Sequence, residues 1–305
     1  MSMDLSLLPP PDVVEALSFE AILEGHKQRL IDLYPVEDQA AIAAVLALES
    51  EPLTRFLEVV GYYELTLRAR INDAARQVML AYASGANLDH LAALLGVERL
   101  VIDAGDPAAD PPIPPTYESD SALRLRTQLA PEGMSTAGPR MSYIYHARSA
   151  SAQVRDAYAE RTLPGLVRVV ILAQPSAENP DGVPGAPLLD TVAAALSADD
   201  IRPVCADVNV EAATVVPYAI AATLYLQDGP DQSVVLAAAQ AAALVYADTQ
   251  FALGRDIAVS GLHAALHRPG VVRVDLTSPA DGLIITNDHA ARCTGIALNN
   301  GGTAW

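Results

Sequence analysis

Residues 52–100 read PLTRFLEVVGYYELTLRARINDAARQVMLAYASGANLDHLAALLGVERL, and they decide how the rest of the chain is organised. Pro52 suits the first turn of a helix, and only Gly61 interrupts the run of helix-forming residues before Gly85. The segment therefore predicts one helix of about thirty residues, far longer than a typical globular helix. Ser84 and Gly85 end it, Asn87 is the expected cap of a short second helix, and the result is a helical hairpin.

Apolar side chains recur along the long helix with a period near 3.5 residues. This spacing keeps one stripe of side chains against a partner helix, while charged residues occupy its flanks. Intramolecular and intermolecular bundles show the same period, so periodicity alone leaves both interpretations open. We call the stripe the seam, and its predicted partner-binding residues are Leu53, Phe56, Val60, Tyr63, Leu67, Ile71, Ala74 and Val78.

Residues 49–100 closely resemble the signature region of the baseplate J-like proteins, wedge components of contractile phage tails and related contractile injection systems. Other stretches agree with that family in the same order along the chain. They are LPPPDVVEALSFEAIL at 8–23, STAGP at 135–139, DDIRPV at 199–204 and HRPGVVRVDLTSP at 267–279. No single motif is chemically decisive, but the ordered series is specific and spans nearly the whole chain.

The resemblance implies a structural assembly protein of the baseplate wedge and no enzymatic activity. In this family, two J-like chains are expected to join one I-like tail protein through a bundle of N-terminal helices. Contacts between J-like chains then link wedges into the baseplate ring, and a sheath-initiator protein and the neighbouring wedges are further expected partners. The implied location is the tail baseplate of the virion, after synthesis and assembly in the host cytoplasm.

The bulk composition agrees with such a role. A chain of 305 residues is long enough for two or three compact units. Its net charge of −18 repels phosphate backbones, so no nucleic-acid partner is expected. Cys205 and Cys293 are too few for a disulfide scaffold or a four-cysteine zinc site, and we expect both to be reduced. No basic, apolar leader and no membrane-length apolar run occurs, which predicts a soluble chain without a membrane span.

The predicted fold class is α+β, with an N-terminal helical bundle that contains the long heptad helix, followed by two small α/β sheet modules. The expected domains are 1–105, the N-terminal helical domain that supplies the core-bundle helices, and 106–150, a proline-rich linker with two connecting helices. Residues 151–212 form the first α/β module and 213–305 the C-terminal α/β module. Within the linker, DPAADPPIPP at 106–115 is expected to be extended and semi-rigid.

Local signals place the elements of the two modules. Pro164 and Gly165 predict a turn between two strands, the second of which, 166–172, is apolar except for Arg168. A helix at 188–196 and a strand at 204–210 complete the first module. In the second, a strand at 218–226 precedes a helix capped by Asp231 and another capped by Ser260. Strands at 271–276 and 293–298 follow, and 299–302 is expected to be flexible.

His263 and His267 form the best candidate metal site, because they are four residues apart on a predicted helix. Ala264 stands where a zinc protease of the HExxH type needs its glutamate, so the base that activates water is absent. Asp256 and Asp275 are candidate third ligands. A soluble metal-dependent enzyme using this pair is the alternative function, and a partly exposed histidine pair near an interface is the favoured interpretation.

Three other motifs were weighed as sites and interpreted as local structure. Ser135 lies in GMSTAG, which is not a G-x-S-x-G nucleophile elbow, and is assigned to the turn before a helix. Asp199 and Asp200 sit at a turn near Arg202, and residues 286–289 lack the oxygen ligands of a calcium loop. We therefore predict no catalytic, cofactor-binding or metal-binding residues. A secreted or hub-associated binding module is disfavoured because the chain shows no leader.

Overall fold

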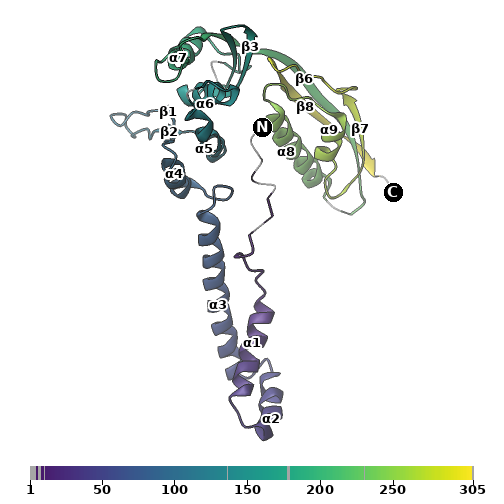
Figure 1. Ribbon diagram of the computed structural model, residues 1–305. Coiled ribbons are helices and arrows are strands. Elements are labelled where there is room, and N and C mark those ends of the chain that lie inside the picture. Colours follow the sequence, from purple (N-terminus) through teal and green to yellow (C-terminus); the bar gives the residue numbers. More distant parts are fainter. Residues whose placement is uncertain are drawn as a thin grey trace. The chain divides into compact units, whose positions relative to one another are not determined.

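The computed structural model describes residues 5, 8–9, 11–135, 137–176, 179–229 and 231–303. The chain divides into two compact units, Met1–Glu98 (unit 1) and Arg99–Trp305 (unit 2). Among the described residues, unit 1 is helical, and unit 2 contains a two-stranded hairpin and two three-stranded sheets with helices against them (Figure 1). The predicted α+β class, with N-terminal helices followed by small sheet modules, is therefore confirmed. The predicted division into four domains stays a prediction.

Unit 1 consists of four helices joined by short turns. They are α1 Phe19–Asp32, α2 Val36–Leu46, α3 Pro52–Gln77 and α4 Gly85–Ala93. The Ser18 hydroxyl accepts the backbone N–H of Ala21 and caps α1. Helix α3 begins at Pro52 as expected and has 26 residues, so it is somewhat shorter than its apolar pattern suggested. Ser84, and not Asn87, is the N-cap of α4, because the Asn87 amide lies inside the helix and donates to the Gln77 side chain.

Helix α1 lies along α3 and packs over Gly61, where the gap is wide enough for a methyl group at ordinary contact distances. A methyl group at position 61 would lie 3.5 Å from the Phe19 ring and 3.9 Å from the Ile22 side chain. Further along α3, the buried Asn72 side chain donates to the backbone carbonyl of Glu15 at 2.9 Å and accepts the Glu15 N–H at 3.1 Å. These contacts hold α1 and the segment just before it against one face of α3.

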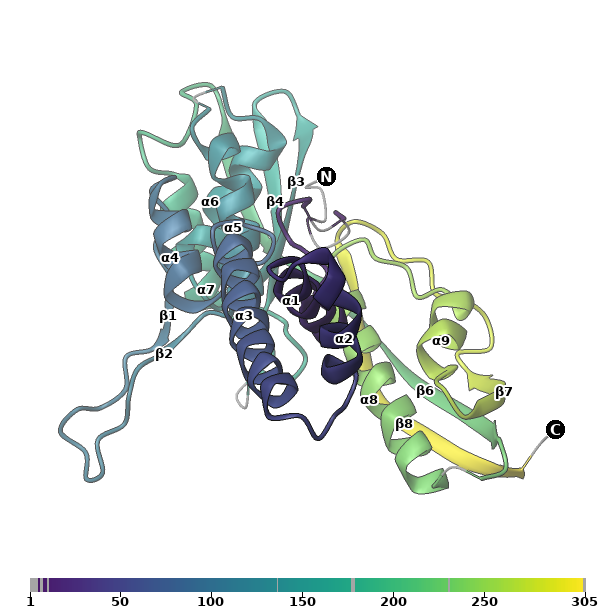
Figure 2. The same ribbon diagram turned by 90° about the horizontal axis from the view of Figure 1, so that it is seen from below.

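The proline-rich stretch 106–115 is the closed end of a hairpin and does not form the extended linker that its composition indicated. Strands β1 Val101–Asp103 and β2 Thr116–Tyr117 pair antiparallel. Asp106 and Ile113 exchange backbone hydrogen bonds of 3.0 and 2.9 Å across the stretch. The pairing requires Gly105, which has a φ of +67° and no room for a side chain beside Ile113. The hairpin projects from the rest of unit 2 (Figure 2).

The first sheet has the order β3-β4-β5, with strands β3 Val154–Leu163, β4 Leu166–Ala173 and β5 Asp207–Ala212. Gly165, with a φ of +84°, forms the predicted turn between the antiparallel β3 and β4. Helix α7 Ala186–Leu196 connects β4 to the parallel β5. Helices α5 Asp120–Gly133 and α6 Arg140–Ala150 precede the sheet, and α6 and α7 share one core cluster with it.

The second sheet has the order β7-β6-β8, with strands β6 Thr214–Leu226, β7 Val271–Ser278 and β8 His289–Thr303. Helices α8 Gln232–Gln250 and α9 Val259–Leu266 cover one face of it (Figure 1). Asp231 caps α8 as predicted, whereas the N-cap of α9 is Ala258 and not Ser260. Strand β8 continues through the residues expected to be flexible, because Asn299 and Asn300 pair with β6.

Phe251, directly after α8, joins the two modules of unit 2. Its side chain is 1% exposed and belongs to a cluster with Val170 and Leu172 of β4 and Ala290 of β8. Arg155 of β3 adds a polar link, since its guanidinium donates to the Phe251 carbonyl at 2.7 Å and lies 5.1 Å from the centre of the ring. The face of the first sheet opposite α6 and α7 is thus covered by the second module.

Arg168, the one polar residue of the apolar strand β4, forms a second contact between the modules. Its guanidinium contacts Glu160 at 3.1 Å, Glu211 at 2.8 Å and Asp288 at 3.3 Å. Asp288 precedes β8 and belongs to the second module. Hydrogen bonds from Thr286, then His289, and also from Arg168 hold the pKa of the Asp288 carboxyl well below its usual value.

We predict that Phe251→Ala lowers the free energy of unfolding of unit 2 by about 3–5 kcal/mol, because it removes a fully buried ring and leaves a cavity between two sheets. Denaturant unfolding of the full chain measures the change. Val245→Ala, at an exposed position of α8, is the matched control and should change stability by less than about 0.5 kcal/mol. A similar small effect for Phe251→Ala would contradict the assigned junction.

We also predict that Asp288→Asn removes an acid-sensitive part of the stability. Because the folded-state pKa of Asp288 is lowered, its contribution is fully present above the usual aspartate pKa and is lost as the pH falls through the lowered value. The stability gap between wild type and variant should therefore be largest above about pH 5 and shrink below about pH 4. Thermal unfolding at several pH values tests this, with the exposed Asp281→Asn as control; a gap that grows on acidification would contradict it.

Candidate functional site

The eight seam residues lie on one face of α3, which is not the face that contacts α1. The buried residues of α3 are Thr54, Leu57, Gly61 and Asn72, and none of them belongs to the seam. At about 100° per residue, the two faces are centred roughly 100° apart around the helix. The structure therefore brings the predicted residues together as a continuous stripe, and Val78 extends it one position past the end of α3.

The large side chains of the seam are exposed to solvent. Phe56 is 62% exposed, Tyr63 71% and Val78 70%. Leu53, Leu67, Ile71 and Ala74 are also exposed, whereas Val60 is half-buried. Of the buried positions on α3, only Leu57 holds a large apolar side chain. Exposed apolar patches of this extent are typical of surfaces that bind another protein.

The flanks of the seam carry charges of both signs, and several of these are paired along the helix. Arg55 contacts Glu58 at 3.0 Å, and Arg68 contacts Glu64 at 2.7 Å. The hydrogen bond and charge of Arg68 lower the pKa of the Glu64 carboxyl. Pairs of this kind are worth only a few tenths of a kcal/mol each, but they leave the flanks near neutral. A second helix can therefore approach the seam without strong repulsion.

The structure places the candidate metal ligands at the end of α9 and on separate neighbouring segments. Helix α9 ends at Leu266, so His263 lies on the helix and His267 lies just past it. The two candidate third ligands have other contacts: Asp256 accepts the N–H of Ile285 at 2.7 Å, and Asp275 contacts Arg273 at 3.0 Å. Within the described part of the chain, no group of three or more His, Cys, Asp or Glu side chains gathers as metal ligands would.

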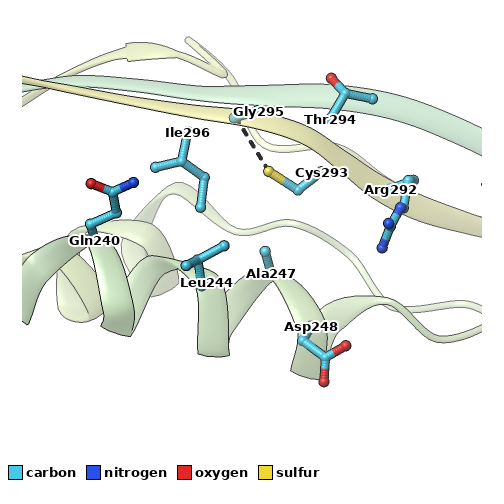
Figure 3. Close-up of a pocket in the computed structure, with 9 residues that line it drawn as sticks. All are labelled: Gln240, Leu244, Ala247, Asp248, Arg292, Cys293, Thr294, Gly295 and Ile296. Carbon is cyan, nitrogen blue, oxygen red and sulfur yellow. Dashed lines mark hydrogen bonds between the residues drawn. The ribbon is translucent and has the colours of Figure 1, made fainter. Parts of the chain in front are cut away.

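An open cleft of ≈440 Å³ lies between α8 and β8 (Figure 3). Three of its polar side chains are engaged in structural contacts. The Cys293 thiol donates to the Gly295 carbonyl at 3.4 Å, and Asp248 contacts Arg155 at 2.9 Å. The Arg292 guanidinium lies 5.1 Å from the centre of the Phe251 ring. No nucleophile in the cleft is paired with a base among the contacts of the described residues.

The remaining motifs have structural roles where they are described. Ser135 precedes a turn in which Gly138 has a φ of +62° and Pro139 is the N-cap of α6, as the helix-start interpretation predicted. Asp199 and Asp200 are exposed after α7. Thr136 of STAGP and Pro10 of LPPPD lie outside the described residues. Separately, no helix of the described ranges is long and apolar enough to cross a membrane.

The polar residues with the most extensive contacts were not predicted as a set. Arg168 stood out in the sequence as the one polar residue of its strand, but its partner Asp288 is 120 positions away. Glu118 and Arg126 form an ion pair in which both side chains are 5% exposed, and Glu118 also accepts the N–H of Leu100 at 2.9 Å. These contacts fix the hairpin and the modules internally, and they leave the seam as the principal candidate site.

Three family models match the chain in order. They are the Baseplate J-like N-terminal domain at residues 49–106, the Baseplate J-like central domain at 135–212 and the Baseplate J-like protein C-terminal domain at 218–299. Helix α3 with the seam lies in the first, and each sheet lies largely in one of the others. Helices α1, α2 and α5 fall outside the matched regions.

A similar protein is Baseplate protein J of Escherichia phage P2. It is 44% identical over 301 residues, which cover 99% of this chain and 98% of that protein. The similarity therefore includes α1 and α2 as well as the three matched regions. On this evidence, the chain belongs to the baseplate J-like family of structural baseplate proteins.

Proposed function

We propose that this protein is a wedge component of a contractile tail baseplate, and that it uses the seam to join helices of an I-like tail protein and of a second copy of itself. The observation that carries the proposal is the direction in which α3 presents its side chains. Gly61 faces α1 and Asn72 binds the backbone just before α1, while the larger Phe56, Tyr63 and Leu67 remain in solvent.

The energetics favour association through this surface. Burying one large apolar side chain contributes about 1.5–3 kcal/mol, so five of them supply on the order of 10 kcal/mol before the cost of association. A period near 3.5 residues keeps such side chains in contact with a partner helix over the whole length of α3. An intermolecular helical bundle therefore accounts for both the period and the exposure of the seam.

The other proposed roles rest on family membership and on charge. Membership supports a place in the virion tail baseplate, with synthesis and assembly in the host cytoplasm. It also supports contacts of the sheet modules with neighbouring wedges and with a sheath-initiator protein. The net charge of −18 is consistent with assembly onto proteins and disfavours a nucleic-acid partner.

We expect no catalytic turnover from this chain, because the described residues present no nucleophile paired with a base and no group of metal ligands. Metal analysis of the purified protein should find far less than one zinc per chain. The metal-dependent alternative requires the opposite result: stoichiometric zinc that is lost on chelation, and a hydrolytic activity that disappears in His263→Ala.

For the seam, we predict that Val60→Asp with Leu67→Asp abolishes co-purification with the I-like protein. In a bundle, the two new carboxylates would be buried without partners, at a cost of several kcal/mol each. In the isolated chain both positions are at least partly exposed, so unit 1 should stay helical and unit 2 should keep its strand signal in circular dichroism.

The control places the same two charges outside the seam. Thr66→Asp with Ala86→Asp, both at exposed positions of unit 1, should leave co-purification unchanged. Wild-type binding by the Val60→Asp and Leu67→Asp variant would eliminate the seam as the interface. Loss of helix signal or aggregation of that variant would instead favour an intramolecular bundle.

A further inference from the structure

Strand β8 lies at an edge of the second sheet, and most of its outer side pairs with no described residue. It pairs with β6 on one side, and on the other side a single bridge joins Leu253 to Ala290. Residues 293–303 contain no charged side chain and no proline, which are features that commonly keep a further strand from adding to an edge. The opposite edge strand, β7, carries Arg273 and Asp275. The outer side of β8 is therefore open to pairing with another strand.

The cleft of ≈440 Å³ between α8 and β8 runs along this free edge (Figure 3). Every residue of 292–296 lines its strand wall, so that wall includes the backbone of β8 as well as its side chains. The helix wall is one face of α8, from Gln240 to Asp248. The helix wall is about 12 Å long, and the strand wall is about 13 Å long. The cleft therefore matches the length of about four residues of extended chain.

The middle of the cleft is apolar. Leu244 and Ala247 of α8 point toward the strand, and Ile296 of β8 points toward the helix (Figure 3). Leu244 is 56% exposed, so covering it with another apolar side chain would be favourable. Because side chains alternate along an extended chain, every second side chain of a segment in the cleft would face this apolar surface.

One end of the cleft carries a positive charge that no described carboxylate neutralises. The Arg292 guanidinium lies 5.1 Å from the centre of the Phe251 ring, and it forms no ion pair with a described residue. Asp248, at the same end of the cleft, contacts Arg155 at 2.9 Å instead (Figure 3). Two guanidiniums and one carboxylate therefore meet around the Phe251 ring. A carboxylate on a bound segment would supply the missing counter-charge.

From these observations we infer that the cleft binds an extended segment of another protein. The segment adds to the free edge of β8, turns apolar side chains toward α8 and places an aspartate or glutamate at Arg292. Backbone hydrogen bonds to the edge supply affinity, while the apolar wall and Arg292 select the sequence. The β8 strand of a second copy does not fit this site, because β8 contains no carboxylate to neutralise Arg292. The cleft lies in unit 2 and the seam in unit 1, so the inference holds or fails separately from the proposed function.

Selection from a library of random displayed heptapeptides against the purified full-length protein tests the preferred chemistry. The selected peptides should carry aspartate or glutamate within about four positions of valine, isoleucine or leucine, and no central proline. The best peptide is then N-methylated at one backbone nitrogen at a time. Binding should weaken about ten-fold or more at alternate positions only, because alternate N–H groups of an added strand point to its neighbour. No enrichment, or equal tolerance of N-methylation at every position, would overturn the inference.

A matched pair of arginine variants locates the peptide in the cleft. Arg292→Gln should weaken binding of the best peptide about ten-fold or more and remove the preference for aspartate and glutamate, and Arg292→Lys should restore part of both. The control is Arg273→Gln, on the opposite edge of the sheet, where the guanidinium also lies against an aromatic ring, 3.8 Å from the centre of Tyr225. It makes the same change in net charge and should leave binding unchanged. Equal loss in both glutamine variants, or wild-type binding by Arg292→Gln, contradicts the assigned site.

Sedimentation of the protein without peptide tests a second copy as the occupant. Wild type and Arg292→Gln should have the same mass in solution, because the cleft takes a segment of a different protein. A larger wild-type assembly that Arg292→Gln dissociates would identify a second copy in the cleft and overturn the inference.

Discussion

The contact between α1 and α3 is the constraint on which the exposure of the seam depends. Gly61 faces Phe19 and Ile22 of α1, and reciprocal hydrogen bonds join Asn72 to Glu15, just before α1. Because this contact occupies one face of α3, the large apolar side chains are directed elsewhere. No residue of α1 is buried, so α1 and α3 do not enclose a hydrophobic core between them. A bundle with helices from other chains would provide such a core.

Unit 2 differs from unit 1 because most of its large apolar side chains are buried within the unit itself. Strand β4 is buried on both faces, by α6 and α7 on one side and by Phe251 on the other. Arg168 then neutralises carboxylates from both modules. Two sheets joined in this way resist separation, which suits a part that must keep its shape while other proteins bind to its surface. Association and rigidity are therefore assigned to different units of the chain.

The sequence predicted those features that depend on neighbouring residues. The period of α3, the cap of α8 at Asp231 and the turn at Gly165 each follow from local patterns, and each is present. The hairpin was missed because proline favours extended backbone locally, whereas the pairing of Asp106 with Ile113 closes a loop. The extension of β8 was missed for a similar reason: Asn299 and Asn300 are stabilised by a strand more than seventy positions away.

The candidate site likewise depends in part on neighbouring residues and in part on contacts between distant segments. Its eight residues were identified from a repeat, but a repeat does not show which face of α3 the chain itself covers. That choice depends on Gly61 and Asn72, whose contacts come from residues near the start of the chain.

The charges beside the seam determine how it can choose a partner. Its flanks mix both signs, and pairs such as Arg55 with Glu58 are satisfied within α3. Such a surface accepts a copy of itself as readily as a foreign helix, and it distinguishes partners by shape. This is the property required of a surface at which identical and unlike helices meet in one bundle, as we propose for the seam.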